Sequence, residues 1–344
     1  EQILISNAKG IDEEQFEREL YVIRRRIEKA AAAAQINGLY ICSLSCRSII
    51  YKGMMLAEQV ATFYPDLMDE RFESAFAIYH QRYSTNTFPQ WWLAQPFRML
   101  AHNGEINTLK GNVNWMRSHE IRMASNAFGD RAEDIKPIIP SGASDSSALD
   151  SVFEVLVRAG RNAPMAKTMM VPEAWSQQAV EMPQAWQDMY GYCNAVMEPW
   201  DGPAALAMTD GRWVCGGLDR NGLRPLRYVV TGDGLLVAGS EVGMVPIDEA
   251  TVVEKGALGP GQMIAVDMKE GKLYHDTEIK DEMAAARPFG EWVDKIKDLD
   301  AELSQVEEKP LFTGEELRRR QSAAGYTIEE LEQILAPMAE DGKE

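Results

Sequence analysis

The segment LAHNGEI, residues 100–106, ends a run of strand-forming residues with an Asn-Gly pair. Such a pair is first of all a turn signal, because both residues tolerate the backbone angles of tight turns. The same pair could also do chemistry. The side-chain amide of Asn103 and the backbone N–H of Gly104 could point at one spot and form an oxyanion hole, which stabilises the negative oxygen of a tetrahedral intermediate. Glycine would let the backbone approach the reacting carbonyl closely.

Acyl transfer from an amino-acid amide also requires groups that bind the α-carboxylate and the α-ammonium. Arg82 in HQRYSTNT suits the carboxylate, because its planar guanidinium can donate two parallel hydrogen bonds. Asp145 in GASDSSALD suits the ammonium. Each residue has a structural alternative: Arg82 could be a salt-bridge partner, and Asp145 could cap the helix that follows it. Taken singly, each residue is better explained by its structural alternative.

Other patterns argue against a metal or nucleotide site in this chain, so no cofactor is expected within it. The four histidines form no HExxH motif and pair with no CxxC. The segment TGDGLLVAG has Val237 where GxGxxG requires its third glycine, and no GxxxxGK[ST] loop occurs.

Cys42 and Cys46 are expected on one face of a strand in the core, because side chains alternate along a strand.

Composition predicts a folded chain of 344 residues with 45% hydrophobic residues, long enough for one large domain and a smaller piece. The formal net charge of −18 repels phosphate backbones and anionic lipids, so neither nucleic acid nor membrane is an expected partner. No targeting signal or membrane-spanning stretch is visible. Four scattered cysteines do not form a disulfide scaffold, which favours a reducing, cytoplasmic setting.

Residues 12–34 predict an amphipathic helix that begins at an Asp12 N-cap. Its run Arg24–Arg26 is expected on the solvated side, and its apolar stripe consists of Phe16, Leu20, Ile23 and Ile27. Further helices are predicted at about residues 54–63, 108–124, 145–159 and 183–197.

Six short runs rich in branched and aromatic residues predict strands, and several contain Asp-Gly or Glu-Gly pairs that favour tight hairpins. The runs are GLYICSLSC, AFAIYHQRYS, RMLAHNG, AALAMTDGRWVCGGL, LRYVVTGDGLLVAGSE and QMIAVDMKEGKLYHD. Helices segregated from hairpin-connected strands predict an α+β fold with antiparallel sheets rather than a doubly wound parallel sheet. From about residue 280 the sequence becomes charged and helical, which predicts one domain at residues 1–294 and the start of another at 295–344.

Several long segments in the same order resemble a known family. They are HQRYSTNTFPQWWLAQPFRMLAHNGEINTLKGN, SGASDSSALD, MEPWDGPAAL and GGLDRNGLRPLRY. Residues 1–294 resemble the glutaminase domain of glutamate synthase large subunits, which is similar to the wider class II glutamine amidotransferases. Residues 295–344 resemble the start of the central linker domain of the same subunits. The resemblance implies a four-layer αββα sandwich of the N-terminal-nucleophile hydrolase type.

The resemblance also implies an activity and residue roles. Arg82 would hold the glutamine carboxylate, Asp145 its amino group, and Asn103 with Gly104 would form the oxyanion hole. Ammonia released from glutamine would aminate 2-oxoglutarate at a second site, and reduction there would give glutamate. FMN, an iron–sulfur cluster, and NADPH or ferredoxin, with FAD on a small (beta) subunit, would belong to other parts of the complete enzyme. Leu218 replaces the first Arg of the family's Arg-Asp-x-x-Gly-x-Arg-Pro-Leu segment, so LDRNGLRPLRY receives no catalytic role.

One departure from the family concerns the nucleophile, which the family places at a cysteine on the mature N-terminus. This chain begins with Glu1. We therefore expect a fragment that lacks the opening strands and is inactive alone. The main alternative is a catalytically silent glutamine-binding or regulatory module. A weaker alternative is a stand-alone hydrolase that uses Cys42 or Cys215, although an internal thiol lacks the adjacent α-amine as base.

Overall fold

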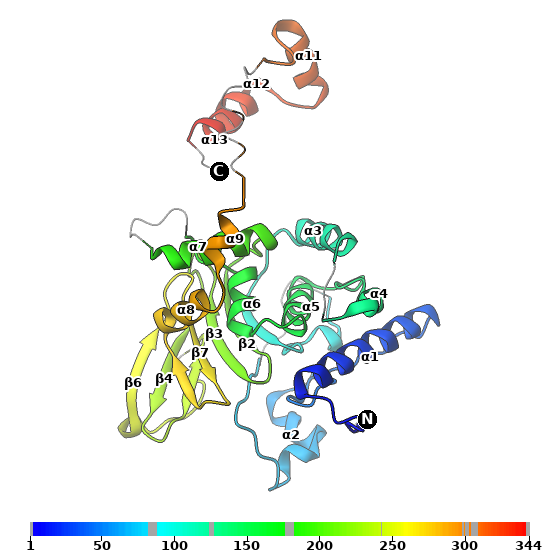
Figure 1. Cartoon of the computed structure of the whole chain (residues 1–344), viewed down its shortest axis with the longest axis vertical. Helices are drawn as coiled ribbons and strands as arrows, with labels where there is room; N and C mark the ends of the chain where they lie inside the picture. Colours follow the sequence, from blue (N-terminus) through cyan, green and yellow to red (C-terminus); the bar gives the residue numbers. More distant parts are fainter. Residues whose placement is uncertain are drawn as a thin grey trace. The chain divides into compact units, whose positions relative to one another are not determined.

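The structure is a computed structural model that describes residues 3–81, 88–123, 127–175, 182–241, 243–297, 299, 303 and 309–341. The chain divides into two compact units, residues 1–294 and 295–344 (Figure 1).

Unit 1 contains two antiparallel sheets. The larger has the order β1-β2-β3-β7-β8 and the smaller the order β5-β4-β6. The predicted α+β class with antiparallel sheets is confirmed. The strands are β1 Leu100–Gly104, β2 Ala204–Thr209, β3 Trp213–Leu218, β4 Arg227–Thr231, β5 Leu236–Gly239, β6 Val252–Ala257, β7 Met263–Asp267 and β8 Lys272–Tyr274.

Two of the six predicted strand runs are wrong within the described residues. The run GLYICSLSC and the described part of AFAIYHQRYS, residues 75–81, contain no strand. A strand requires a hydrogen-bonded neighbour, and no described segment pairs with either run. Cys42 is consequently half-buried and Cys46 exposed, so the expectation that both lie in the core of a strand is wrong.

Helices α6 and α8 pack on the larger sheet, and α5 and α7 pack on α6. One continuous apolar cluster joins these helices to β1, β2, β3 and β7. The helices of unit 1 are α1 Glu13–Ala33, α2 Val60–Phe63, α3 Leu109–Ile121, α4 Ala132–Ile135, α5 Asp145–Arg158, α6 Ala163–Met170, α7 Gln184–Val196, α8 Asp276–Ala285 and α9 Phe289–Val293, with short 3₁₀ turns at Ala57–Gln59, Pro65–Met68, Trp91–Leu93, Gly129–Arg131 and Glu249–Thr251.

Helix α1 forms where the sequence predicts it, and Asp12 is its N-cap through a 2.9 Å hydrogen bond from the backbone N–H of Gln15. Its buried face differs from the prediction. Arg24 and Arg25 are buried, whereas Ile23 and Ile27 of the predicted apolar stripe are exposed. The two guanidinium groups can be buried because both form ion pairs with Glu28, at 2.9 and 2.7 Å.

Unit 2 is helical in its described part. It contains α11 Gly314–Ala323, α12 Ile328–Glu330, a π-helical turn at Leu331–Leu335 and α13 Ala336–Asp341. Thr327 caps α12 and exchanges hydrogen bonds with Glu330. None of the described residues of this unit is buried. Among the described helices of both units, none combines the length and the apolar character needed to cross a bilayer.

Candidate active site

The Asn103–Gly104 pair lies at the end of β1, where two backbones cross very closely. Gly104 has φ +144°, and a Cβ atom on it would lie 1.7 Å from the carbonyl oxygen of Pro203. Gly202 has φ +146°, and its Cβ would lie 2.1 Å from the carbonyl oxygen of Glu105. The obstacle in both cases is main chain, so glycine is required on each side of the crossing. The bend after β1 is therefore fixed by backbone geometry.

The backbone N–H of Gly104 faces the free side of β1. In an antiparallel pair, successive residues direct their N–H and C=O groups alternately toward and away from the partner strand. At His102 both groups point away from β2, because they bond the side-chain amide of Gln95 at 2.7 and 3.1 Å. Gly104 lies two residues further on, so its N–H points the same way. This orientation leaves the N–H available to a small molecule, as an oxyanion hole requires.

Asn103 lies between these two residues, so its side chain projects from the strand face opposite to that of His102. The residue is half-buried. Its side-chain amide makes no hydrogen bond to any described residue, which leaves the amide N–H groups free to bind an acceptor.

Asp145 is the first residue of α5, and the structure brings it to the bend. Its Oδ2 accepts a 2.9 Å hydrogen bond from the backbone N–H of Ile106, two residues beyond Gly104. The alternative that Asp145 caps the helix is wrong, because the N-cap is Ser144, whose hydroxyl accepts from the Ser147 N–H. Asp145, Asn103 and Gly104 thus belong to one neighbourhood, and the helix N-terminus favours a negative group there.

Two further polar residues at this point were not predicted. His102 is buried, and its Nε2 lies 2.6 Å from the hydroxyl oxygen of Ser146. The Ser146 hydroxyl in turn donates to Asp145 Oδ1 at 3.2 Å. Burial lowers the pKa of His102 to about 4, so the ring is neutral near neutral pH. The sequence contains no motif that joins these residues, which are 44 positions apart.

Asp150, in the middle of α5, ties that helix to the start of β1. Its carboxylate accepts from the backbone N–H groups of Met99 at 2.8 Å and Arg98 at 3.2 Å. Burial and, after it, the charge of Glu154 raise the pKa of Asp150 to about 6. Because Asp145 and Asn103 lie on these same two elements, Asp150 helps to set their separation.

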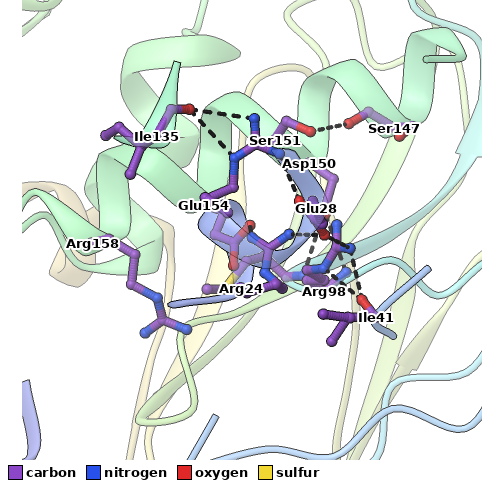
Figure 2. Close-up of polar contacts among 12 residues, drawn as sticks. Arg24, Glu28, Ile41, Arg98, Ile135, Ser147, Asp150, Ser151, Glu154 and Arg158 are labelled. Atoms are coloured by element: carbon purple, nitrogen blue, oxygen red, sulfur yellow. Dashed lines mark hydrogen bonds and ion pairs between the residues drawn. The ribbon is translucent and has the colours of Figure 1, made fainter. Parts of the chain in front are cut away.

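Charged groups from three segments surround Asp150 (Figure 2). Arg24 of α1 forms an ion pair with Glu154 of α5. The Arg98 side chain bonds Glu28 of α1 at 3.0 Å. We call Arg24, Glu28, Arg98, Asp150 and Glu154 the ion cluster. It joins α1, α5 and the segment before β1, and buried pairs of this kind depend strongly on both partners remaining present.

Asp219 positions the opposite side of the bend. Its carboxylate accepts from the backbone N–H groups of Ala204, Asn221 and Gly222 at 3.0, 2.9 and 3.0 Å. Ala204 is paired with Gly104 in the sheet. The LDRNGLRPLRY segment therefore supports β2 at the crossing through Asp219.

Two expectations about reactive side chains have different outcomes. Arg82 belongs to residues 82–87, which the structure does not describe, so its predicted role stays a prediction. The four cysteines are all described, and desolvation raises the pKa of each thiol, with Glu17 adding to the effect at Cys46. A raised pKa reduces the thiolate fraction, which makes these thiols poor nucleophiles.

The described residues offer no metal ligand set at the bend, and the one cavity characterised below has a different lining. Within the described part of the chain, no group of three or more His, Cys, Asp or Glu side chains could hold a metal ion. A cavity of about 1400 Å³ extends from Ser45 past Lys52 and His80 to Pro246. Asn103, Gly104 and Asp145 are not among the described residues that line it. The described part of the site at the bend therefore lies outside the lining of that cavity.

Comparison with known proteins supports the resemblance predicted from the sequence. The family model described as "Glutamine amidotransferases class-II" matches residues 1–292. The chain is 63% identical over 347 residues to the glutamate synthase (NADPH) large chain of Azospirillum brasilense, covering 100% of this chain and 23% of that protein. It is 45% identical over 352 residues to the ferredoxin-dependent glutamate synthase, chloroplastic, of Oryza sativa subsp. japonica, covering 100% of this chain and 21% of that protein.

The chain therefore spans about a fifth of the length of these curated relatives. A solved structure of glutamine phosphoribosylpyrophosphate amidotransferase from B. subtilis aligns over 57% of this chain and 34% of that one, with 20% identity and a TM-score of 0.31. That score is too low to establish a common fold. The family model, in contrast, matches most of the sequence, and the chain belongs to the class II glutamine amidotransferases.

Proposed function

We propose that this chain is the glutamine-binding part of the glutaminase domain of a glutamate synthase. The observation that carries the proposal is the 2.9 Å hydrogen bond between Asp145 and the Ile106 N–H, which holds a carboxylate beside the Asn103–Gly104 bend. The complete protein would hydrolyse glutamine to glutamate and ammonia.

Each residue then has a distinct role. Asp145 binds the α-ammonium of glutamine, and Arg82 binds its α-carboxylate through the paired N–H groups of the guanidinium. When the side-chain amide is attacked, its carbonyl oxygen becomes negative. The Asn103 amide and the Gly104 N–H donate hydrogen bonds to that oxygen, and the rigid crossing with Gly202 keeps them in place before the reaction begins.

The attacking thiol is assigned to no cysteine of this chain. The raised pKa of each of the four thiols supports that assignment. We propose that the nucleophile is supplied by a part of the complete protein outside these residues, as the resemblance to N-terminal-nucleophile enzymes implies.

The complete protein would use the released ammonia to aminate 2-oxoglutarate and reduce the product to glutamate. We propose residues 1–294 as the glutaminase domain and residues 295–344 as the start of the central linker domain. FMN, an iron–sulfur cluster, and NADPH or ferredoxin, with FAD on a small (beta) subunit, would serve the reduction. The described residues show no ligand set for a metal, so no step of that chemistry is assigned to them. The proposed location is the cytoplasm.

The test of this function is Asn103→Ala in the complete protein. Loss of one oxyanion donor should lower glutaminase turnover by roughly 10²- to 10³-fold. Ammonia release from glutamine measures it directly. Asn107→Ala is the matched control, because Asn107 is exposed four residues away and should leave turnover within about twofold of the unmodified protein. Turnover close to normal in Asn103→Ala would remove the role given to this residue.

A further inference from the structure

The buried side of the bend carries a row of three polar side chains. His102 Nε2 is 2.6 Å from Ser146 Oγ, and Ser146 Oγ is 3.2 Å from Asp145 Oδ1. The other carboxylate oxygen, Oδ2, bonds the Ile106 N–H at 2.9 Å. The row starts on β1, passes through the first turn of α5 and returns to the segment after β1. Both oxygens of Asp145 are thus held, each by a donor from a different segment.

The direction of the hydrogen bonds follows from the chemistry of each group. A carboxylate only accepts, so the single hydroxyl proton of Ser146 points to Asp145. Ser146 must then accept at its other contact, and the proton of the imidazole lies on Nε2. The remaining nitrogen, Nδ1, is buried and makes no hydrogen bond to the described residues. It carries a lone pair in this tautomer, so no buried N–H is left unpaired.

We propose that His102 and Ser146 are positioning residues for substrate selection. The directed row from imidazole to hydroxyl to carboxylate holds Asp145 in the orientation that receives the α-ammonium of glutamine. This inference rests on the proposed function, since it explains how the ammonium site is kept in place. No hydrogen bond joins the three side chains of the row to the Asn103 amide or the Gly104 N–H, so we expect the row to act on binding rather than on the attack.

The Ser146→Ala variant of the complete protein tests the row. Without the hydroxyl, Oδ1 of Asp145 loses its donor and the carboxylate can turn about its last bond. The KM for glutamine should rise by roughly 10- to 100-fold, the effect of one hydrogen bond to a charged group, while kcat stays within about threefold. The matched control is Ser147→Ala, the next residue of α5, whose hydroxyl bonds no described residue.

A substrate without the α-amino group separates positioning from general damage. 4-Carbamoylbutanoate has the carboxylate and the reacting amide of glutamine but no ammonium. Its KM should be nearly the same for Ser146→Ala and the unmodified protein. An equal rise of KM for both substrates would overturn the inference, because a merely structural role affects both. An unchanged glutamine KM in Ser146→Ala would also overturn it.

Variants of the imidazole provide a second, independent readout. Gln can place an N–H near the position of Nε2, so His102→Gln should keep glutamine KM closer to normal than His102→Leu does. Equal KM values for these two variants would overturn the inference. The Asp145→Asn variant separates failure of the positioning row from failure of the proposed ammonium site. A raised glutamine KM in Asp145→Asn with an unaffected Ser146→Ala overturns the positioning row alone, whereas an unchanged KM in Asp145→Asn overturns the proposed ammonium site as well.

Discussion

Gly104 combines two properties at the scale of a single residue. Its φ of +144° is a conformation that residues with side chains rarely adopt, and the space beside its Cα is filled by the Pro203 carbonyl. Both properties serve the proposed oxyanion hole, because the backbone N–H reaches the substrate only if the strand bends at this point. The positive φ and the close contact are therefore features that the proposed site would use.

Gly104→Ala should both destabilise unit 1 and abolish glutaminase activity. The left-handed region alone costs a residue with a side chain about 1–3 kcal/mol. The contact at 1.7 Å adds to that cost, because main-chain atoms must move to relieve it. Gly234→Ala is the control: Gly234 has φ +89° but nothing within 4 Å of its Cβ position. Denaturant unfolding of the two variants compares them, and equal losses of stability would contradict the crossing.

The sequence identifies some of the proposed functional residues but not others. Asn103, Gly104 and Asp145 follow from residue type and from the family segments around them. His102 and Ser146 do not, because their contact exists only once α5 has docked against β1. A strand pattern assigns His102 to the buried face, where apolar contact is the ordinary expectation. Only the packed structure gives the imidazole a polar partner.

Helix α5 is the element that organises the site. Its first turn carries Asp145 and Ser146, and its middle carries Asp150, which bonds the backbone before β1. The ion cluster then fixes the same helix to α1. The sequence predicts both helices from their periodicity, but it assigns Arg24 and Arg25 to solvent. Partners for those guanidinium groups come from segments that periodicity alone does not bring together, so the buried face of α1 could not be predicted.

The buried carboxyl of Asp150 on α5 should make the free energy of unfolding depend on pH. Its pKa is raised from 3.8 to about 6 in the folded chain, so protonation of Asp150 favours folding. That contribution is complete below about pH 4 and is lost as the pH rises through about 6. The amide of the Asp150→Asn variant does not titrate, so this variant lacks that pH dependence. The free energy of unfolding of this variant, minus that of the unmodified chain, should therefore rise between pH 4 and pH 6.

Chemical denaturation at several pH values measures that difference. Asp130→Asn provides the control, since Asp130 is an exposed carboxyl outside the ion cluster. A difference that stays flat over this interval for Asp150→Asn would contradict the role of burial at this position.

The strands show the same division between local and distant information. Asp-Gly and Glu-Gly pairs correctly predict the hairpins β2–β3, β4–β5 and β7–β8, because a tight turn is a local property. Strand β6 is not among the predicted runs, because only the two Val residues of its VVEKGA sequence are strong strand formers. The two wrong runs have suitable residues but no described neighbour with which to pair.

At the scale of the whole molecule, the two units differ in how they are stabilised. The buried residues of the main apolar cluster all lie between Tyr21 and Phe289, within unit 1. The described residues of unit 2 contribute no buried side chain. Stability of unit 1 therefore depends on its own core.

A chain that ends at Asp294 should keep the stability of unit 1. The main apolar cluster ends before that point, so the free energy of unfolding of the shortened chain should lie within about 0.5 kcal/mol of the value for residues 1–344. Denaturant titration monitored by the tryptophan fluorescence of unit 1 measures both chains. A larger loss would show that residues 295–344 stabilise the first unit.

The hydrogen bonds between Gln95 and His102 have a consequence for what can approach β1. The Gln95 side-chain amide accepts from the His102 N–H and donates to the His102 carbonyl, so it bonds the main chain of His102 as an adjoining strand would. An extended peptide that tried to extend the sheet would find those groups occupied one residue before Asn103. Another segment could therefore pair with β1 at His102 only after the Gln95 side chain had left these two main-chain groups.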